Sequence, residues 1–142
     1  MEGCMMEEKE YVKKEGAKKR VLLVDDVEEI RIAHAELLLP FFDVQVAETG
    51  ERALQIFNSF KPDLVILDIE LIGTSPALQG PDLLGLMKEA LGDVVICMVS
   101  GRSDLKKKMI LLGADAFFEK PVSRGELFDF LIGVGLLDTV NE

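Results

Sequence analysis

Apolar and polar positions follow one another along the chain in blocks that predict short strands separated by helices. Three runs, at 21–24, 64–67 and 94–99, are continuously apolar, which is typical of strands buried on both faces. Two further runs, at 43–47 and 116–118, predict shorter strands. A long loop is expected at 69–79, where Gly, Ser and Pro interrupt the pattern.

Between these runs, apolar residues recur at helical spacing and predict five helices. Residues that start or stop helices lie at the block ends, namely Pro40, Thr49, Gly92, Gly113, Ser123 with Glu126 three residues later, and Gly133. Strands that alternate with helices indicate right-handed crossovers and a parallel sheet covered on both faces. The prediction is a single doubly wound α/β domain with a five-stranded sheet in the order 2-1-3-4-5.

Length and charge bound the function. The chain has 142 residues, which suits one domain, predicted over 18–136, with a mobile charged tail at 1–17 and a short tail at 137–142. The net charge is −10, and an acidic body repels nucleic-acid backbones. No apolar run approaches the ~20 residues that span a bilayer. Two isolated cysteines are typical of reduced thiols, so we expect a cytoplasmic protein without a membrane or nucleic-acid partner.

Chemically versatile side chains follow four of the predicted strands. Asp25 and Asp26 follow the first, Asp68 the third, Ser100 the fourth and Lys120 the fifth. Ligands of open α/β sheets bind beyond the carboxyl ends of the strands, so these residues should converge there. A lone residue of this kind is usually a turn or cap residue, but all four strands carrying one by chance is improbable.

Three neighbouring carboxylates repel one another unless a cation compensates. Oxygen ligands favour Mg²⁺, with Mn²⁺ as an alternative, and neither cysteine nor histidine is placed to make a zinc site. An aspartate beside Mg²⁺ and a lysine can attack a phosphoryl group, so Asp68 is the predicted acceptor. Lys120 would neutralise the phosphoryl oxygens, and the Ser100 hydroxyl would donate to one of them.

The sequence resembles the receiver domain of two-component response regulators over about 18–136. The resemblance rests on Val-Asp-Asp at 24–26, Leu-Asp at 67–68, Ser-Gly at 100–101 and Lys-Pro at 120–121. It implies a stand-alone, flavodoxin-like phosphoprotein, similar to chemotaxis regulators, that takes phosphoryl from a sensor histidine kinase or histidine phosphotransfer protein. The chain itself would catalyse only its own phosphorylation and slow dephosphorylation.

The resemblance also implies roles for individual residues. Asp26 would bind Mg²⁺ directly and Asp25 partly through water, and the backbone carbonyl of Glu70 would complete the protein ligands. Ser100 would move toward the phosphoryl group, and Phe117 would rotate inward as an aromatic switch. The Lys-Pro bond at 120–121 should be cis. The fourth helix, fifth strand and fifth helix would form the face that binds a downstream protein or a second copy.

Three features depart from the family pattern. The family usually has proline where this chain has Ile72, and Gly80 lies twelve residues after Asp68, so the loop is longer than usual. The extra segment could be a flap or a partner contact, or only a tolerated insertion. Glu70 and Arg102 flank the predicted site mouth, where they could pair and slow hydrolysis, or remain two solvated charges.

Other interpretations stay open at this level. A haloacid-dehalogenase-type phosphatase also has an acceptor aspartate followed by an acid two residues later, as at Asp68 and Glu70. A flavodoxin-like FMN binder and a receiver that works without phosphorylation are further alternatives. His34 is expected to be a partly buried structural residue. The basic run at 106–108 is either a solvated helix face or a surface for an acidic partner or second copy.

Overall fold

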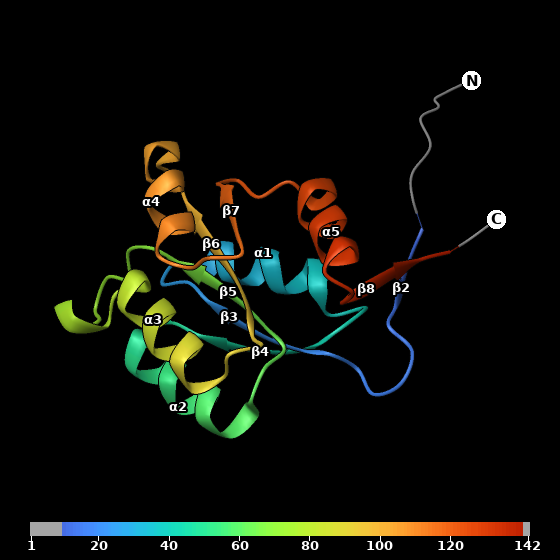
Figure 1. Cartoon of the computed structure of the whole chain (residues 1–142), viewed down its shortest axis with the longest axis horizontal. Helices are drawn as coiled ribbons and strands as arrows, with labels where there is room; N and C mark the ends of the chain where they lie inside the picture. Colours follow the sequence, from blue (N-terminus) through green and yellow to red (C-terminus); the bar gives the residue numbers. More distant parts are fainter. Residues whose placement is uncertain (1–9, 141–142) are drawn as a thin grey trace.

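The computed structural model describes residues 10–140, and its body is a five-stranded sheet between two layers of helices (Figure 1). The strands are β3 (Arg20–Val24), β4 (Asp43–Ala47), β5 (Leu64–Asp68), β6 (Val95–Ser100) and β7 (Ala116–Glu119). All pairings are parallel, in the order β4-β3-β5-β6-β7. This confirms the predicted strand order and the doubly wound α/β class.

Within residues 10–140, five helices alternate with these strands, as the sequence predicts. They are α1 (Glu28–Leu38), α2 (Gly50–Phe60), α3 (Gly80–Ala90), α4 (Lys106–Leu111) and α5 (Arg124–Gly133), with short 3₁₀ turns η1 (Pro76–Leu78) and η2 (Ser103–Leu105). The expected caps form: the Thr49 hydroxyl accepts from the Arg52 N–H at 3.1 Å, and the Ser123 hydroxyl accepts from the Glu126 N–H at 3.2 Å. The fourth helix is shorter than expected because η2 replaces its first turn.

Successive strand residues contribute to two separate cores. In β3, Leu22 and Val24 belong to the core that includes side chains of α2, α3 and α4, whereas Val21 and Leu23 belong to the core that includes side chains of α1 and α5. All four side chains are at most 1% exposed, which explains why this strand reads as a continuous apolar run. Cys97 lies in the second core with no exposed surface, as expected of a small buried residue.

The two predicted tails need correction where the structure describes them. Instead of loose ends, β2 (Tyr11–Lys13) and β8 (Leu137–Thr139) form a two-stranded antiparallel sheet. The Tyr11 ring packs edge-on against Phe128 at 4.8 Å between ring centroids, and the Arg124 guanidinium lies 4.9 Å from the Tyr11 ring centroid. Residues 1–9 and 141–142, which include Cys4 and the outer parts of both predicted tails, lie outside the described residues.

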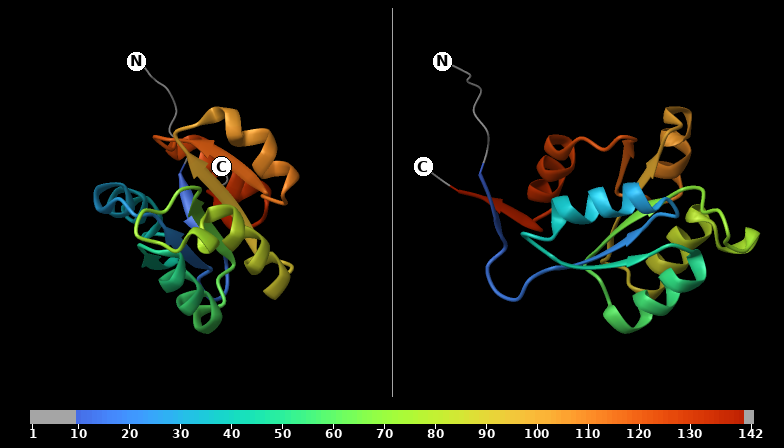
Figure 2. Two further views of the ribbon diagram at one scale, coloured as in Figure 1. Left: turned by 90° about the vertical axis from the view of Figure 1, so that its left-hand side faces the viewer. Right: turned by 180° about the vertical axis from the view of Figure 1, so that it is seen from behind.

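The parallel strands all end at one edge of the sheet, and the β2–β8 pair lies at the far end of the molecule from that edge (Figure 2). The side chains predicted to carry chemistry therefore gather away from the termini of the described chain. Within residues 10–140, every helix is too short or too polar to cross a membrane.

Candidate functional site

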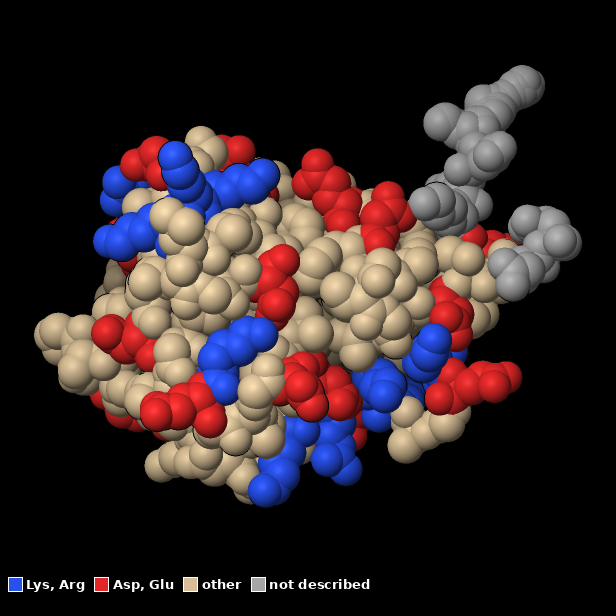
Figure 3. Space-filling model, in the orientation of Figure 1, with Lys and Arg blue, Asp and Glu red and all other residues tan. Residues whose placement is uncertain are grey.

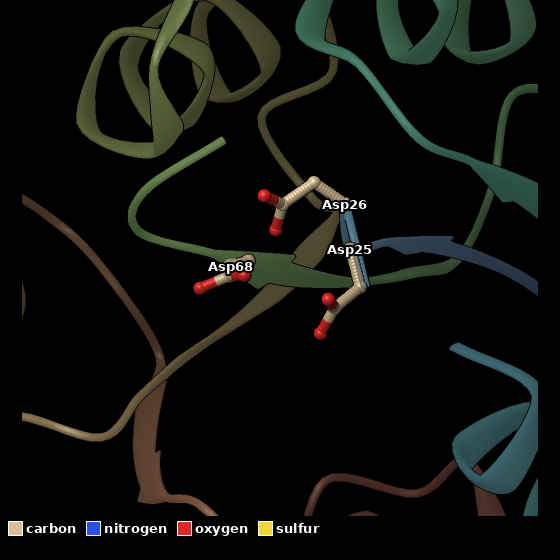
Figure 4. A group of neighbouring side chains, drawn as sticks. All are labelled: Asp25, Asp26 and Asp68. Atoms are coloured by element: carbon tan, nitrogen blue, oxygen red, sulfur yellow. The ribbon is translucent and has the colours of Figure 1, made fainter. Parts of the chain in front are cut away.

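Three aspartates come together where β3 and β5 end. Val24 pairs with Leu67 in the parallel ladder, so Asp25, just after β3, and Asp68, the last residue of β5, lie at neighbouring strand ends. One carboxylate oxygen from each of Asp25, Asp26 and Asp68 lies within 4.8 Å of the others (Figure 4). Asp25 is 2% exposed and Asp68 is 7% exposed. Buried, clustered carboxylates of this kind fit the ligand preferences of a hard divalent cation.

Lys120 supplies a positive charge to this cluster. Its Nζ donates to Oδ2 of Asp68 at 3.0 Å and lies 3.1 Å from Oδ2 of Asp25. The Lys120 N–H donates to the Ser100 carbonyl at 2.9 Å, which fixes the lysine backbone at the end of β6. The Lys120–Pro121 peptide bond is cis, as expected.

Burial and neighbouring charges set the protonation of the site. Burial raises the pKa of Asp68 from 3.8 to about 6, and the charges of Asp25 and Asp26 add to this, against the hydrogen bond and charge of Lys120. Burial lowers the pKa of Lys120, but its hydrogen bonds and charge interactions with Asp68 and Asp25 outweigh burial and raise it. The lysine therefore stays charged, and the raised pKa of Asp68 means that its charged form is costly in the folded protein.

Ser100 and Phe117, the two predicted switch residues, lie on the neighbouring strands β6 and β7. Ser100 is the last residue of β6, and its buried hydroxyl accepts from the Arg102 N–H at 3.0 Å. The hydroxyl proton remains available for a further acceptor. Phe117 lies in β7, half-buried against the core on the α4 side of the sheet.

Of the two alternatives for Glu70 and Arg102, the structure has no ion pair between them. The Arg102 guanidinium instead bonds the Asp104 carboxylate, at 2.9 Å from Nη2 and 3.3 Å from Nε. Asp104 lies two residues away on the same loop, so pairing with it orders less chain than a bond across the site mouth. Glu70 is exposed, as a solvated charge would be.

The structure adds contacts at the site that the sequence did not predict. The Ile72 N–H donates to Oδ2 of Asp26 at 3.0 Å, so the loop after β5 touches the acidic cluster directly. Arg31 of α1 donates to the Asp25 carbonyl at 2.8 Å. His34 is buried nearby, and burial lowers its pKa, as the charge of Lys120 also does, against the charge of Asp25. The contacts of Ile72 and Arg31 each involve a backbone group, and such contacts cannot be predicted from the spacing of residue types.

The raised pKa of Asp68 predicts a pH-dependent stability in the metal-free protein. The unfolded carboxyl ionises near 3.8 and the folded one near 6, so stability falls as pH rises from about 4 through about 6. Asp68→Asn removes this cost. In EDTA at pH 8 the variant should exceed the wild type by roughly 3 kcal/mol at most, and this advantage should shrink toward zero near pH 4.

Urea unfolding at several pH values measures this difference. Asp93→Asn is the matched control, because Asp93 is an exposed aspartate before β6, at the other end of the strands. This variant shows whether the loss of any exposed carboxylate gives the same change of stability with pH. An Asp68→Asn protein that is less stable than the wild type at pH 8 contradicts the prediction.

Comparisons with known proteins agree with this arrangement. A sequence profile described as "Response regulator receiver domain" matches residues 21–132. The chemotaxis protein CheY of Halobacterium salinarum is 32% identical over 119 residues, which are 82% of this chain and 96% of that protein. The receiver domain of NtrX from Brucella abortus superposes with a TM-score of 0.74 at 31% identity, over 80% of this chain and 96% of that one.

Longer regulators match over part of their length. The transcriptional regulatory protein PrrA of Mycobacterium tuberculosis is 34% identical over 112 residues, which are 76% of this chain but 46% of the relative. The chain thus spans less than half of that regulator and nearly all of the CheY relative. With the profile match covering most of its length, the chain belongs to the response regulator receiver domain family.

Proposed function

We propose that this receiver takes a phosphoryl group from a phosphohistidine onto Asp68. One observation carries the proposal: a buried carboxylate at a strand end lies among two further aspartates and 3.0 Å from a lysine ammonium. The donor would be a sensor histidine kinase or a histidine phosphotransfer protein, in keeping with the family. The same membership favours a receiver over a haloacid-dehalogenase-type phosphatase or a flavin binder.

The transfer follows from the chemistry of Asp68. An ionised carboxylate oxygen attacks phosphorus and forms the acyl phosphate, while the P–N bond to the donor imidazole breaks and its electron pair returns to nitrogen. Lys120 exchanges part of its contact with Asp68 for a phosphoryl oxygen. The Ser100 hydroxyl donates to another of these oxygens. Water later attacks phosphorus and releases phosphate slowly, so the chain turns over nothing except its own modification.

A divalent cation completes this proposal. The carboxylates of Asp25, Asp26 and Asp68, with the backbone carbonyl of Glu70, would hold Mg²⁺ or Mn²⁺. When bound, the cation offsets the negative charge that gathers on the phosphoryl oxygens. The three carboxylates, two of them buried, would otherwise repel an incoming phosphoryl group.

Phosphorylation would be reported through the face built from α4, β7 and α5. Ser100 ends β6 and Phe117 lies in the adjoining β7, so movement of the first toward Asp68 would open space for the second. Lysine and arginine side chains gather over α4 in Figure 3, where residues 106–108 are lysines, and Leu111 beside them is 78% exposed. We expect a downstream protein or a second copy there, in the cytoplasm.

Small-molecule phosphorylation tests the proposal. Incubation with acetyl phosphate and Mg²⁺ should raise the intact mass by one phosphoryl group, and EDTA should prevent this. The modification should be cleaved by hydroxylamine, as acyl phosphates are. Sustained turnover of p-nitrophenyl phosphate would favour the phosphatase instead. No modification with Mg²⁺ present, together with no response to beryllofluoride, would favour a receiver that works without phosphorylation.

An apolar groove beside the site suits a helix of the phosphoryl donor. It lies between α1 and the loop after β7, has a volume of about 590 Å³ and is lined mainly by apolar side chains, including Ile30, Leu37 and Val122. Lys120 also lines the groove and contacts Asp68, so a helix seated there would bring its phosphohistidine within reach of the acceptor.

A charge placed in this groove should slow phosphoryl transfer from a protein donor but not from a small-molecule donor. We expect Ile30→Asp to slow phosphoryl transfer from a histidine kinase or phosphotransfer protein at least tenfold, because burying an unpaired carboxylate opposes docking. The rate with acetyl phosphate should stay within about twofold of the wild type. Ile32→Asp is the matched control, since Ile32 is 50% exposed on the same helix and lies outside the groove. Equal rates for both variants with the protein donor would exclude this docking surface.

A further inference from the structure

The long loop after β5 is folded around one side chain, that of Gln79. Its Oε1 accepts from the Leu71 N–H at 2.7 Å, and its Nε2 donates to the Leu71 carbonyl at 3.1 Å. The same Nε2 lies 3.3 Å from the carbonyls of Thr74 and Ser75. The amide thus pairs with both backbone groups of Leu71 as a neighbouring strand would, and it closes the loop on itself.

Contacts on either side keep the loop in place. The Thr74 hydroxyl accepts from the Gly50 N–H at 2.9 Å, at the start of α2, and the Ser75 N–H donates to Glu51 at 3.1 Å. Gly80 begins α3 directly against β5, where a β-carbon would overlap the Asp68 carbonyl. The Gly80 N–H donates to the Ile69 carbonyl at 3.0 Å. The middle of the loop is therefore anchored to the start of α2, and its last residue is anchored to the end of β5.

The residue next to Leu71 connects this loop to the acidic cluster. The Ile72 N–H donates to Oδ2 of Asp26 at 3.0 Å, while the Ile72 side chain is 81% exposed. Ile72 therefore acts here through its backbone. Leu71 is 2% exposed and held by Gln79 through its N–H and its carbonyl, so the peptide that presents the Ile72 N–H has a fixed position.

We infer that Gln79 is a positioning residue for the cation site, acting through the Ile72 N–H on the Asp26 carboxylate. This inference rests on the proposed function, because it concerns the cation of that same site. A carboxylate that is already oriented by an N–H loses less conformational freedom when it binds a cation. Substitution of a residue that hydrogen-bonds a metal ligand commonly lowers metal affinity by roughly 10- to 100-fold. The longer loop is thereby a support for the site and not only a surface insertion.

Cation titration of variants tests the inference. Gln79→Ala should weaken Mn²⁺ binding, followed by electron paramagnetic resonance with Mg²⁺ as competitor, by roughly tenfold. Gln79→Glu should weaken it as well, because the new carboxylate faces the carbonyls that Nε2 now binds. A purely electrostatic effect would instead strengthen cation binding in the Glu variant. Gln55→Ala is the control, because Gln55 is exposed on α2 and bonds only Arg52 through its side chain.

Two further measurements keep the outcome decisive. Ile72→Pro deletes the donor N–H and should lower the affinity as much as Gln79→Ala does, with no further loss when the two are combined. Amide exchange at Ile72, measured by NMR in EDTA, should speed up in Gln79→Ala while exchange in β3 and β5 is unchanged. That pattern shows a folded sheet with a released loop.

The results also separate this inference from the proposed function. If the wild type binds Mn²⁺ and accepts phosphoryl while Gln79→Ala binds Mn²⁺ as tightly or more tightly, the positioning role of Gln79 is overturned and the receiver function stands. If the wild type neither binds the cation nor accepts phosphoryl, the proposed function itself fails.

Discussion

Asp68→Asn is expected to leave the chain unable to gain a phosphoryl group from acetyl phosphate. The amount of modified protein should fall below detection. The amide that replaces the carboxylate has no charged oxygen to attack phosphorus. The neighbouring aspartates are poor substitutes, because Asp25 accepts from the Val27 N–H at 2.9 Å and Asp26 from the Ile72 N–H at 3.0 Å. Intact mass spectrometry after incubation with acetyl phosphate and Mg²⁺ measures the effect, and peptide mapping of the wild type locates the modified residue.

The control for this experiment is the exposed carboxylate of Asp93. Asp93→Asn removes the same charge from the chain but lies before β6, away from the acidic cluster, so it should be modified like the wild type. Modification of Asp68→Asn at the wild-type rate would show that another residue is the acceptor. A modified peptide that does not contain Asp68 would lead to the same conclusion.

Asp26→Asn should have the second large effect, a fall of at least about tenfold in Mg²⁺ or Mn²⁺ affinity. The substitution removes one of three carboxylates whose oxygens lie within 4.8 Å of one another, and cation affinity in oxygen sites depends on the number of charged ligands. Asn can still accept from the Ile72 N–H, so the loop should stay in place. Isothermal titration calorimetry at pH 7.5 measures the affinity.

Asp43 provides the matched control for the cation site. It is exposed at the start of β4, the opposite end of the sheet from the cluster, so Asp43→Asn changes the net charge without touching the site. Its cation affinity should remain within about twofold of the wild type. If both variants lose affinity equally, the cation responds to net charge alone and the three-aspartate site is excluded.

Much of the fold could be predicted because the three central strands, β3, β5 and β6, are buried on both faces. Val21 and Leu22 pack into different cores, so both must be apolar, and a continuous apolar run results. The gathering of Asp25, Asp68 and Lys120 was predictable for a related reason. Parallel strands end at one edge, and a residue directly after a strand has little freedom to lie elsewhere.

Contacts that depend on tertiary placement could not be predicted. A strand of three residues is too short to show a periodic pattern. The strand β2 is held in place by the packing of Tyr11 against Phe128 and Arg124 of α5, which are distant in the sequence. The sequence left open whether Arg102 pairs with Glu70 across the site mouth, and it did not indicate that Asp104, two residues away, is the partner. The role of Gln79 depends on which backbone groups a folded loop presents, which no spacing of residue types encodes.

The β2–β8 sheet brings the two ends of the described chain into register. Tyr11 lies opposite Thr139, and the Val140 N–H donates to the Glu10 carbonyl at 3.0 Å. A turn of about two residues, such as Asn-Gly, could therefore join Val140 to Glu10 as an ordinary β-hairpin. A circular permutant opened at the exposed residues 92–93 would keep every strand pairing and the acidic cluster. The permuted chain would therefore begin and end on the surface between α3 and β6, and its fold would be unchanged.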